Sequence, residues 1–110
     1  MNVKIEKISD VTVVMVEGEV NLSNSMSLRA SLKKLMDDGS RKISVDLLKV
    51  AFIDSSGLAV LIEAVQNLEP LKGQLRLCNV NANIRGIFEI TKIHKLINIY
   101  ENRELALKDF

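Results

Sequence analysis

The stretch RKISVDLLKVAFIDSSGLAVLIEAVQNL, residues 41–68, determines the fold class of this 110-residue chain. In its first half, apolar side chains occur on both faces of an expected strand. Ile43, Val45 and Leu47 lie on one face, and Leu48 and Val50 lie on the other. A strand that is apolar on both faces is typical of a central parallel strand covered by helices. After Asp54 the period becomes helical, with a stripe of Leu58, Leu61, Ile62, Val65 and Leu68. The segment Asp54–Gly57 is therefore the turn from a buried strand into a helix.

The rest of the chain supplies further strands and helices around this unit. Val3 and Ile5 alternate with charged residues, Ser9-Asp10 marks a two-residue turn, and residues 11–18 form a second strand, so a hairpin is expected. Residues 23–38 have helical spacing, with Asn21 or Ser23 as the expected cap. A third buried-type strand is predicted for residues 73–80, followed by a helix over 81–90 capped by Asn81 or Asn83. Residues 96–100 predict a short strand, and residues 101–110 predict a last helix with Leu105 inward.

The resulting order is β-β-α-β-α-β-α-β-α over residues 1–110. Alternation of strands and helices indicates an α/β fold with right-handed crossovers and a mostly parallel sheet. Here the sheet has an antiparallel lead strand and about four helices. The length suits one domain and is too short for two.

Composition excludes several classes of function. Fifteen Lys and Arg balance 14 Asp and Glu, and the chain has three Phe, one Tyr and no Trp. Nucleic-acid binding usually requires clustered cations, and single-strand binding also uses aromatic platforms, so no nucleic-acid partner is expected. One cysteine, Cys78, permits no disulfide within the chain and suits a reducing compartment. Charges interrupt every apolar run, so we expect a cytoplasmic protein without a membrane segment.

The chemistry is expected at the turn formed by Asp54, Ser55, Ser56 and Gly57. In open α/β sheets, sites gather at the carboxyl ends of strands. The start of a helix offers unpaired N–H groups and a positive dipole, so an anion is favoured there. A phosphate on serine would add about two negative charges without unfolding the domain. A partner packed over the turn would then lose affinity, which is how a phosphorylation switch works.

A structural interpretation stands beside this one. Asp-Ser-Ser before an apolar helix is also an ordinary N-cap, in which Asp54 or Ser55 accepts a backbone hydrogen bond. Gly57 favours a special role, because glycine in a first helical turn lowers stability relative to alanine. Its presence is explained most easily if another group approaches the backbone closely.

Other candidate sites are weaker. His94 is the only histidine, and Ser55 lacks the flanking glycines of a nucleophile elbow, so an enzyme is not expected. Cys78 is expected to be a small core residue. Glu17, Glu19 and Asp46 form no recognisable metal set and are expected to be solvated or to cap. The chain has no Walker-type loop or dinucleotide glycine pattern, so no cofactor is expected.

Three segments resemble the STAS domain of bacterial anti-sigma factor antagonists. The stretch VAFIDSSGLAVLI, residues 50–62, is similar to the family signature, in which a hydrophobic strand precedes Asp-Ser-Ser-Gly-Leu and a helix. VEGEVNLSNSMSLR, residues 16–29, resembles the family's segment leading into the first helix. Residues 73–107 resemble its second half, so the resemblance covers essentially the whole chain as a single STAS domain.

The resemblance implies partner switching. In this family the unphosphorylated antagonist binds an anti-sigma factor that is also a serine kinase, which frees a sigma factor. Phosphorylation separates the complex, and a serine phosphatase restores the antagonist. The acceptor position maps to Ser55, and Ser56 is the less favoured neighbour. The family often has Asp where this chain has Asn21, so the charge near the turn differs.

The expected partner-binding surface consists of Asn21, Asp54, Ser55, Ser56 and Gly57. Two alternatives stay open. The strand-end anion site could serve a small-molecule-binding or nucleotide-binding α/β domain. The chain could also be a STAS scaffold in a larger signalling complex, with Ser55 never phosphorylated. The partner, the sigma factor and the oligomeric state do not follow from the sequence.

Overall fold

The computed structural model describes all 110 residues, and its elements follow the predicted order. One five-stranded sheet has the order β1-β2-β3-β4-β5. Its strands are β1 (Asn2–Ile8), β2 (Val11–Val20), β3 (Lys42–Ile53), β4 (Gln74–Cys78) and β5 (Asn98–Tyr100). β1 pairs antiparallel with β2 through a two-residue turn, and the other neighbours are parallel. The predicted mostly parallel sheet with an antiparallel lead strand is confirmed.

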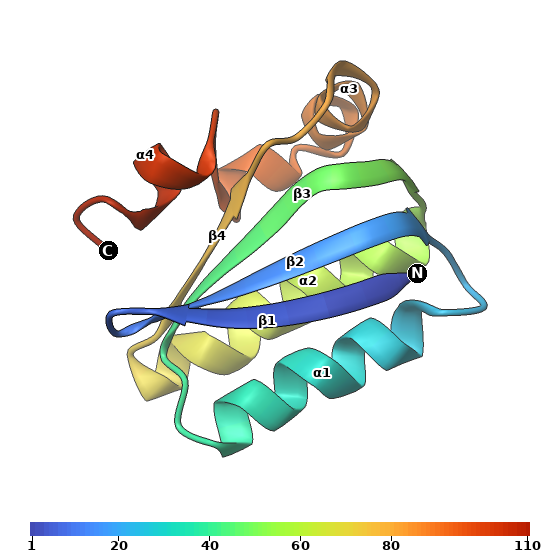
Figure 1. Ribbon diagram of the computed structural model, residues 1–110. Helices are drawn as coiled ribbons and strands as arrows, with labels where there is room; N and C mark the ends of the chain where they lie inside the picture. The colour runs from blue at the N-terminus through green and yellow to red at the C-terminus, as the bar shows by residue number, and fades with distance from the viewer.

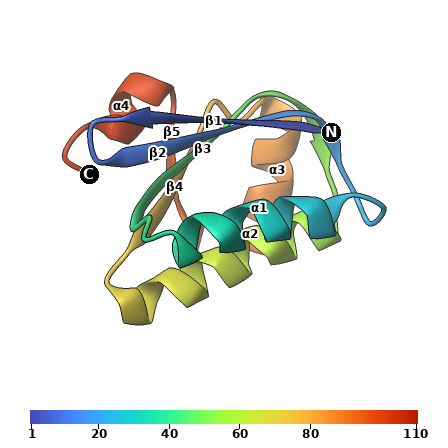
Figure 2. The same cartoon turned by 60° about the horizontal axis from the view of Figure 1, so that its bottom comes forward.

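Two helices cover one face of the sheet. They are α1 (Ser25–Asp37) and α2 (Ser55–Leu68), which lie side by side beneath the strands (Figures 1 and 2). The domain core contains 22 buried residues, and most of them lie between these layers, including Val14 of β2, Leu32 of α1 and Leu61 of α2. The 3-10 turn η1 (Glu69–Leu71) then leads from α2 towards β4. The apolar stripes of the two helices therefore account for this layer.

The last two helices complete the domain. α3 (Ala82–Thr91) packs against β3 and is followed by the 3-10 turn η2 (Ile93–Lys95). α4 (Arg103–Leu107) packs against β3, β4 and β5, on the side of the sheet away from α1 and α2 (Figure 2). The prediction that Leu105 points inward is wrong, because Ala106 is the fully buried residue of α4 and Leu105 is exposed.

Arg76 of β4 fastens the C-terminal segment to the sheet. Its guanidinium donates hydrogen bonds to the carbonyl oxygens of Ala106, Lys108 and Asp109 at 2.8–3.1 Å. The same group lies 4.2 Å from the ring centroid of Phe110. Backbone carbonyls and an aromatic face therefore compensate this buried cation, although its Nε has no hydrogen-bond partner.

β3 departs from the predicted alternation after Leu47. Leu48 was predicted to face a covered side of the sheet but is exposed, because the pairing with β2 shifts register between Met15 and Glu17. An irregularity of this kind turns the following side chains away from strict alternation. Asp46, which was expected to be solvated or to cap, is buried, and its carboxylate accepts the backbone N–H of Leu48 at 3.0 Å. Its carboxylate binds Arg103 of α4 at 2.9 Å and Asn79 at 3.0 Å.

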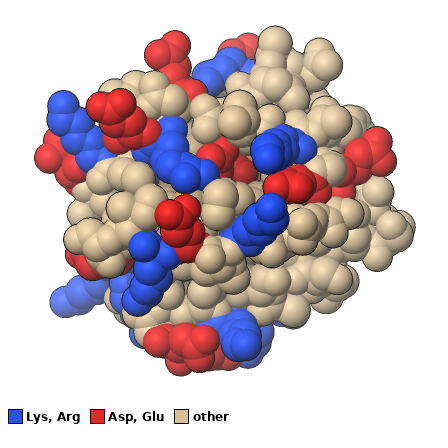
Figure 3. Space-filling model, viewed as in Figure 1, with Lys and Arg blue, Asp and Glu red and all other residues tan.

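Charge is mixed over the surface. The face seen in Figure 3 carries Lys and Arg interleaved with Asp and Glu, without a broad region of one sign. Glu17, for example, lies between Lys4 and Lys49. This face therefore lacks the clustered cations that bind a phosphate backbone. No helix of the domain is both long and apolar enough to cross a membrane.

Candidate functional site

The Asp-Ser-Ser-Gly turn lies where β3 passes into α2. β3 ends at Ile53, and the Asp54 N–H donates to the Val20 carbonyl of the neighbouring strand at 3.0 Å. Asp54 is then the N-cap of α2, and Ser55 is its first helical residue. Of the two predicted caps, Asp54 is the one that forms. The turn is thus held at the carboxyl ends of two parallel strands.

The Asp54 carboxylate already occupies the helix start as an anion. It accepts hydrogen bonds from the N–H groups of Ser56 at 2.9 Å and Gly57 at 3.2 Å, and from Leu22 at 3.1 Å. The bond from the Ser56 hydroxyl, with these three N–H groups, lowers the pKa of Asp54 below its usual range despite partial desolvation. The expectation of unpaired donors at this helix start is therefore wrong for these two N–H groups of α2.

The two serines have different surroundings. The Ser56 hydroxyl donates a short hydrogen bond to the Asp54 carboxylate, and its residue is half-buried. Ser55 is exposed, and its hydroxyl has no hydrogen-bond partner within the chain. A modifying enzyme could therefore reach the Ser55 oxygen without breaking an internal bond.

Gly57 lies beneath the turn and is buried. A Cβ atom at this position would lie 2.6 Å from Ile53 Cγ1 and 2.8 Å from Val20 Cγ1. The close approach expected at this glycine therefore comes from core side chains of the domain itself. Gly57 sets the position of the first turn of α2 against the two strands.

Asn21 begins the loop between β2 and α1. Its side-chain oxygen accepts from the N–H of Ser23 at 3.0 Å and from the Ser23 hydroxyl. The predicted capping of α1 by Asn21 or Ser23 is wrong, because α1 starts at Ser25 with Asn24 in the cap position. Asn24 instead accepts from the Asn21 N–H at 2.9 Å and donates to the Glu19 carbonyl. These bonds shape the loop that presents Leu22 to Asp54.

Apolar residues surround the turn on two sides. Leu22 is 79% exposed, and Met26 in the first turn of α1 is 62% exposed. On the other side lies a shallow groove of about 220 Å³ between α2 and the end of α3. Its lining consists of Ser55, Leu58, Ala59, Ile62, Thr91 and Ile93. The sequence analysis missed this groove, since it depends on how α3 packs beside α2.

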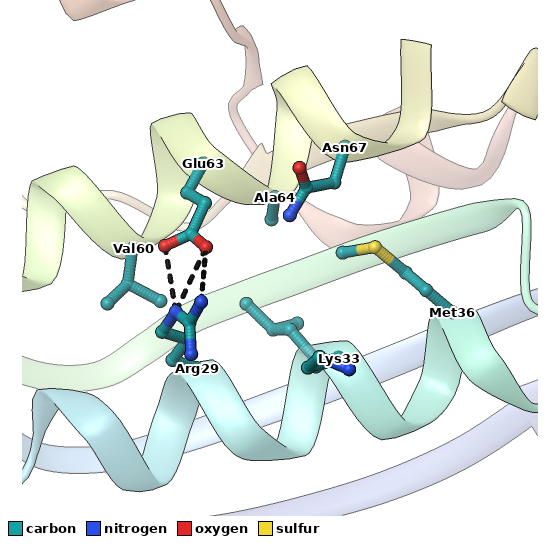
Figure 4. Close-up of a pocket in the computed structure, with 8 residues that line it drawn as sticks. Arg29, Lys33, Met36, Val60, Glu63, Ala64 and Asn67 are labelled. Carbon is teal, nitrogen blue, oxygen red and sulfur yellow. Dashed lines mark hydrogen bonds and ion pairs between the residues drawn. The ribbon is translucent and has the colours of Figure 1, made fainter. Parts of the chain in front are cut away.

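A second small concavity lies between α1 and α2. It measures about 40 Å³, and the ion pair between Arg29 and Glu63 spans it at 2.8 Å (Figure 4). The bond from Arg29 is the main cause that lowers the pKa of Glu63. This pair links the two helices, and the space beside it is too small for a typical organic ligand.

The remaining candidates have structural surroundings. His94 is exposed, and its Nδ1 lies 3.2 Å from the Phe88 carbonyl oxygen. Cys78 is fully buried as predicted, and burial, with the charge of Asp46, raises the pKa of its thiol to about 11. No three His, Cys, Asp or Glu residues are grouped to hold a metal ion.

Comparison with protein families then identifies the fold. The model of the STAS domain matches residues 2–106 of the chain. The chain belongs to the STAS domain family. The resemblance seen in the sequence is thereby confirmed, and the matched residues include the Asp54–Gly57 turn of this STAS domain.

Relatives of this STAS domain are regulators by name. BtrV of Bordetella bronchiseptica, whose name assigns it to the anti-sigma factor antagonists, is 30% identical over 110 residues, covering 100% of this chain and 95% of BtrV. The anti-sigma-B factor antagonist of Staphylococcus aureus is 30% identical over 92 residues, covering 84% and 85% of the two chains.

Solved structures share the fold. A Thermotoga maritima protein described among the anti-sigma factor antagonists superposes with a TM-score of 0.92 at 21% identity, covering 97% of this chain and 92% of that chain. The Bacillus cell fate determinant SpoIIAA in its phosphorylated form superposes with a TM-score of 0.73 at 20% identity, covering 94% and 96%. At these identities the likeness concerns the fold alone.

Proposed function

We propose that this STAS domain is an anti-sigma factor antagonist that is switched by phosphorylation of Ser55. In its unmodified form it binds an anti-sigma factor that is also a serine kinase, which frees a sigma factor for transcription. The kinase transfers phosphate from ATP to the Ser55 oxygen, and the complex separates. A serine phosphatase returns the antagonist to its binding form. The domain acts as a substrate in the cytoplasm and not as an enzyme.

One observation carries this proposal: the exposed Ser55 hydroxyl is free, whereas the neighbouring Ser56 hydroxyl is bound to Asp54. A phosphoryl acceptor must present its oxygen to the γ-phosphate in line with the leaving group. The Ser55 hydroxyl can be offered to the phosphate without first breaking an internal bond. Ser56 would first have to give up its bond to the carboxylate, which favours Ser55 as the acceptor.

The charge at the turn explains how phosphate would act. A phosphoserine carries about −1.5 to −2 charges at neutral pH. On Ser55 it would lie beside the Asp54 carboxylate, which already binds the N–H groups of Ser56 and Gly57. The added anion is therefore little compensated within the domain and faces the partner. Like charge and buried phosphate oxygens at an interface weaken binding by roughly a hundredfold or more.

The surface around Ser55 fits a protein partner. Asn21, Asp54, Ser55 and Ser56 form its polar centre, and Gly57 supports it from below. Leu22 and Met26 add exposed apolar area on one side, and the groove next to Ala59 and Ile62 adds it on the other. A polar centre with apolar neighbours is common in specific protein interfaces. The shallow groove offers little of the enclosure that a small-molecule site needs.

The test uses the purified chain, ATP and each serine kinase of the anti-sigma type from the same organism. Phosphate is located by mass spectrometry, and binding is measured before and after modification. We expect one phosphate on Ser55 and loss of kinase binding by about a hundredfold or more. Ser55→Ala should bind the kinase and accept no phosphate, whereas Ser56→Ala should still be phosphorylated on Ser55.

Other results would change the assignment. Tight binding without phosphate would favour an antagonist or scaffold in which Ser55 is not modified. Phosphate on Ser56 in the native chain would contradict the assignment of the acceptor. Neither binding nor phosphate with any such kinase would overturn partner switching and favour a ligand-binding domain.

A further inference from the structure

The outer edge of the sheet at β1 is free and regular. β1 is the terminal strand, and its only partner is β2. All 7 residues of the strand, Asn2–Ile8, pair with β2 without a register shift, so no bulge bends the edge away. Figure 1 shows β1 along the front of the sheet, with no other strand beyond it. A regular edge of this length can accept another strand.

Along β1, the backbone N–H and C=O groups of successive residues point alternately towards β2 and away from it. The turn that joins β1 to β2 determines which residues point away. Ile8 and Val11 flank the two-residue turn at Ser9, whose φ of 58° suits the first central position of a II′ turn. Such a closing pair exchanges both of its hydrogen bonds, and the bonded pairs alternate along the hairpin. The backbone N–H and C=O groups of Val3, Ile5 and Lys7 therefore face outward.

The side chains of β1 divide between the two faces. Ile5 lies opposite Val14, which belongs to the core, so it points to the helix-covered face, yet it remains 50% exposed. Lys4 and Glu6 point to the other face, where they lie opposite Met15 and Val13. The middle of the strand therefore presents one uncovered isoleucine on one face and two opposite charges on the other.

We propose that two copies of this chain pair antiparallel through β1, with each Ile5 opposite Ile5 of the second copy. The outward N–H and C=O groups of the two Ile5 residues then bond to each other. Lys4 lies opposite Glu6 of the second copy, and Glu6 lies opposite its Lys4. The two half-exposed isoleucines cover one another, and the two five-stranded sheets become continuous.

Charge complementarity selects this register. Only even shifts keep the outward-facing groups of both strands in phase. A shift of two residues in one direction places Lys4 opposite Lys4 of the second copy. The same shift in the other direction places Glu6 opposite Glu6. Like charges directly opposite destabilise a strand pair, whereas opposite charges stabilise it.

The interface leaves the signalling turn free. Ser55 lies beyond the end of β3, which is separated from the β1 edge by β2. Each copy can therefore present its turn while β1 is paired. The inference does not depend on phosphorylation, and its test is independent of any kinase.

Charge reversal tests the register. Sedimentation equilibrium over a concentration series is measured for the native chain and for Lys4→Glu, Glu6→Lys and the double variant. Each single reversal creates two like-charge contacts in the symmetric interface, so we expect the dimer to weaken by about tenfold or more. The double variant should restore native association, because opposite charges then again lie across from each other at both contacts.

The double variant also separates the interface from effects within one copy. Lys4 and Glu6 have weak exposed ion pairs with Glu17 and Arg103, at 3.7 Å and 3.6 Å. In the double variant both of these internal contacts still join like charges, as each does in its own single variant. Recovery of the dimer can therefore come only from pairing between copies.

A cross-link gives a second readout that does not depend on charge. Directly opposite residues of a bonded antiparallel pair have Cα atoms about 5.5 Å apart, within the range of a disulfide. Ile5→Cys should form a covalent dimer on mild oxidation, since the native Cys78 is buried. Lys7→Cys, which would lie about 14 Å from its equivalent at about 3.4 Å per residue, should form little.

Four outcomes overturn the proposal. If the chain stays monomeric throughout the concentration series, the β1 edge does not pair with a second copy. The edge would then be available only to an extended segment of another protein. Association that both single reversals leave unchanged would place the dimer interface elsewhere. Failure of the double variant to recover, or equal cross-linking of Ile5→Cys and Lys7→Cys, would contradict the register.

Discussion

Two adjacent serines at the start of α2 differ in what their hydroxyl groups meet. Ser56 donates to the Asp54 carboxylate, whereas Ser55 is exposed and free. The difference follows from helix geometry, because an N-cap side chain reaches the second and third helical residues and not the first. Asp54 thereby makes the two serines chemically distinct and leaves the Ser55 hydroxyl exposed, as the proposed phosphorylation requires.

Gly57 is packed closely against core side chains beneath this turn. Gly57→Ala would place a Cβ 2.6 Å from Ile53 Cγ1, so we expect destabilisation by about 1–3 kcal/mol from overpacking. Gly86 of α3 is the matched control, because its Cβ would meet nothing within 4 Å. Gly86→Ala should stabilise the domain by about 0.5–1 kcal/mol through helix propensity. Urea unfolding of both variants measures the difference.

An equal gain in stability for both glycine variants would contradict this account. It would mean that Ile53 and Val20 move aside at little cost. Circular dichroism of folded Gly57→Ala, together with kinase binding, would then show whether the turn itself has shifted.

Two charged contacts hold α4 to the sheet. Arg103 at the start of α4 binds the buried carboxylate of Asp46 at 2.9 Å, and Arg76 binds carbonyl oxygens at the end of the same segment. A helix of 5 residues has little stability of its own. These contacts, with burial of Ala106, therefore hold it in place.

Asp46 makes this attachment dependent on pH. Burial alone would raise its pKa, but bonds from Asn79, the Leu48 N–H and Arg103, with the charge of Arg103, together lower it. A lowered pKa in the folded state stabilises the domain above the unfolded pKa of about 3.9, and this stabilisation is lost as pH falls further. The native chain should therefore exceed Asp46→Asn in stability most above about pH 5, with a smaller difference below about pH 4.

Chemical denaturation across this pH range measures that difference. Asp38→Asn is the control, because Asp38 is exposed and forms no ion pair. Its free energy of unfolding should stay within about 0.5 kcal/mol of the native value at each pH. A constant gap between the native chain and Asp46→Asn at every pH would show that the charge of Asp46 does not matter.

Across the domain, the sheet separates the two proposed interaction surfaces. The carboxyl ends of β2 and β3 carry the Ser55 turn, and the β1 edge carries the proposed self-pairing surface. A core of 22 buried residues keeps the Ser55 turn and the β1 edge in fixed positions relative to each other. A modification at the turn can therefore change the surface without altering the fold.

Cys78 reports on the opening of the whole domain. The thiol is fully buried on β4, and burial raises its pKa to about 11. A thiol reagent at about pH 8 should therefore label native protein only through unfolding, and label urea-unfolded protein at once. The labelling rate should be proportional to the equilibrium population of the unfolded state. Rapid labelling of native protein would indicate local opening of β4.

Much of the fold could be predicted from the sequence. The periods of residues 41–68 and the hairpin turn at Ser9 predicted the element order and the antiparallel lead strand, and the structure confirms both. The wrong predictions concern residues whose burial is set by contacts with distant segments and not by the local sequence pattern. Leu48 is exposed because of a register shift with β2, and Asp46 is buried because α4 supplies Arg103.

The strands, the helices, the family signature and the place of the turn follow from residues that are close together in the chain, so local patterns predict them. Packing between distant segments makes Asp54 bind the N–H of Leu22 and brings Gly57 against Val20. It also completes the groove beside Ser55 with Ile93. These contacts join segments far apart in the chain, and they arise from packing that no local period encodes.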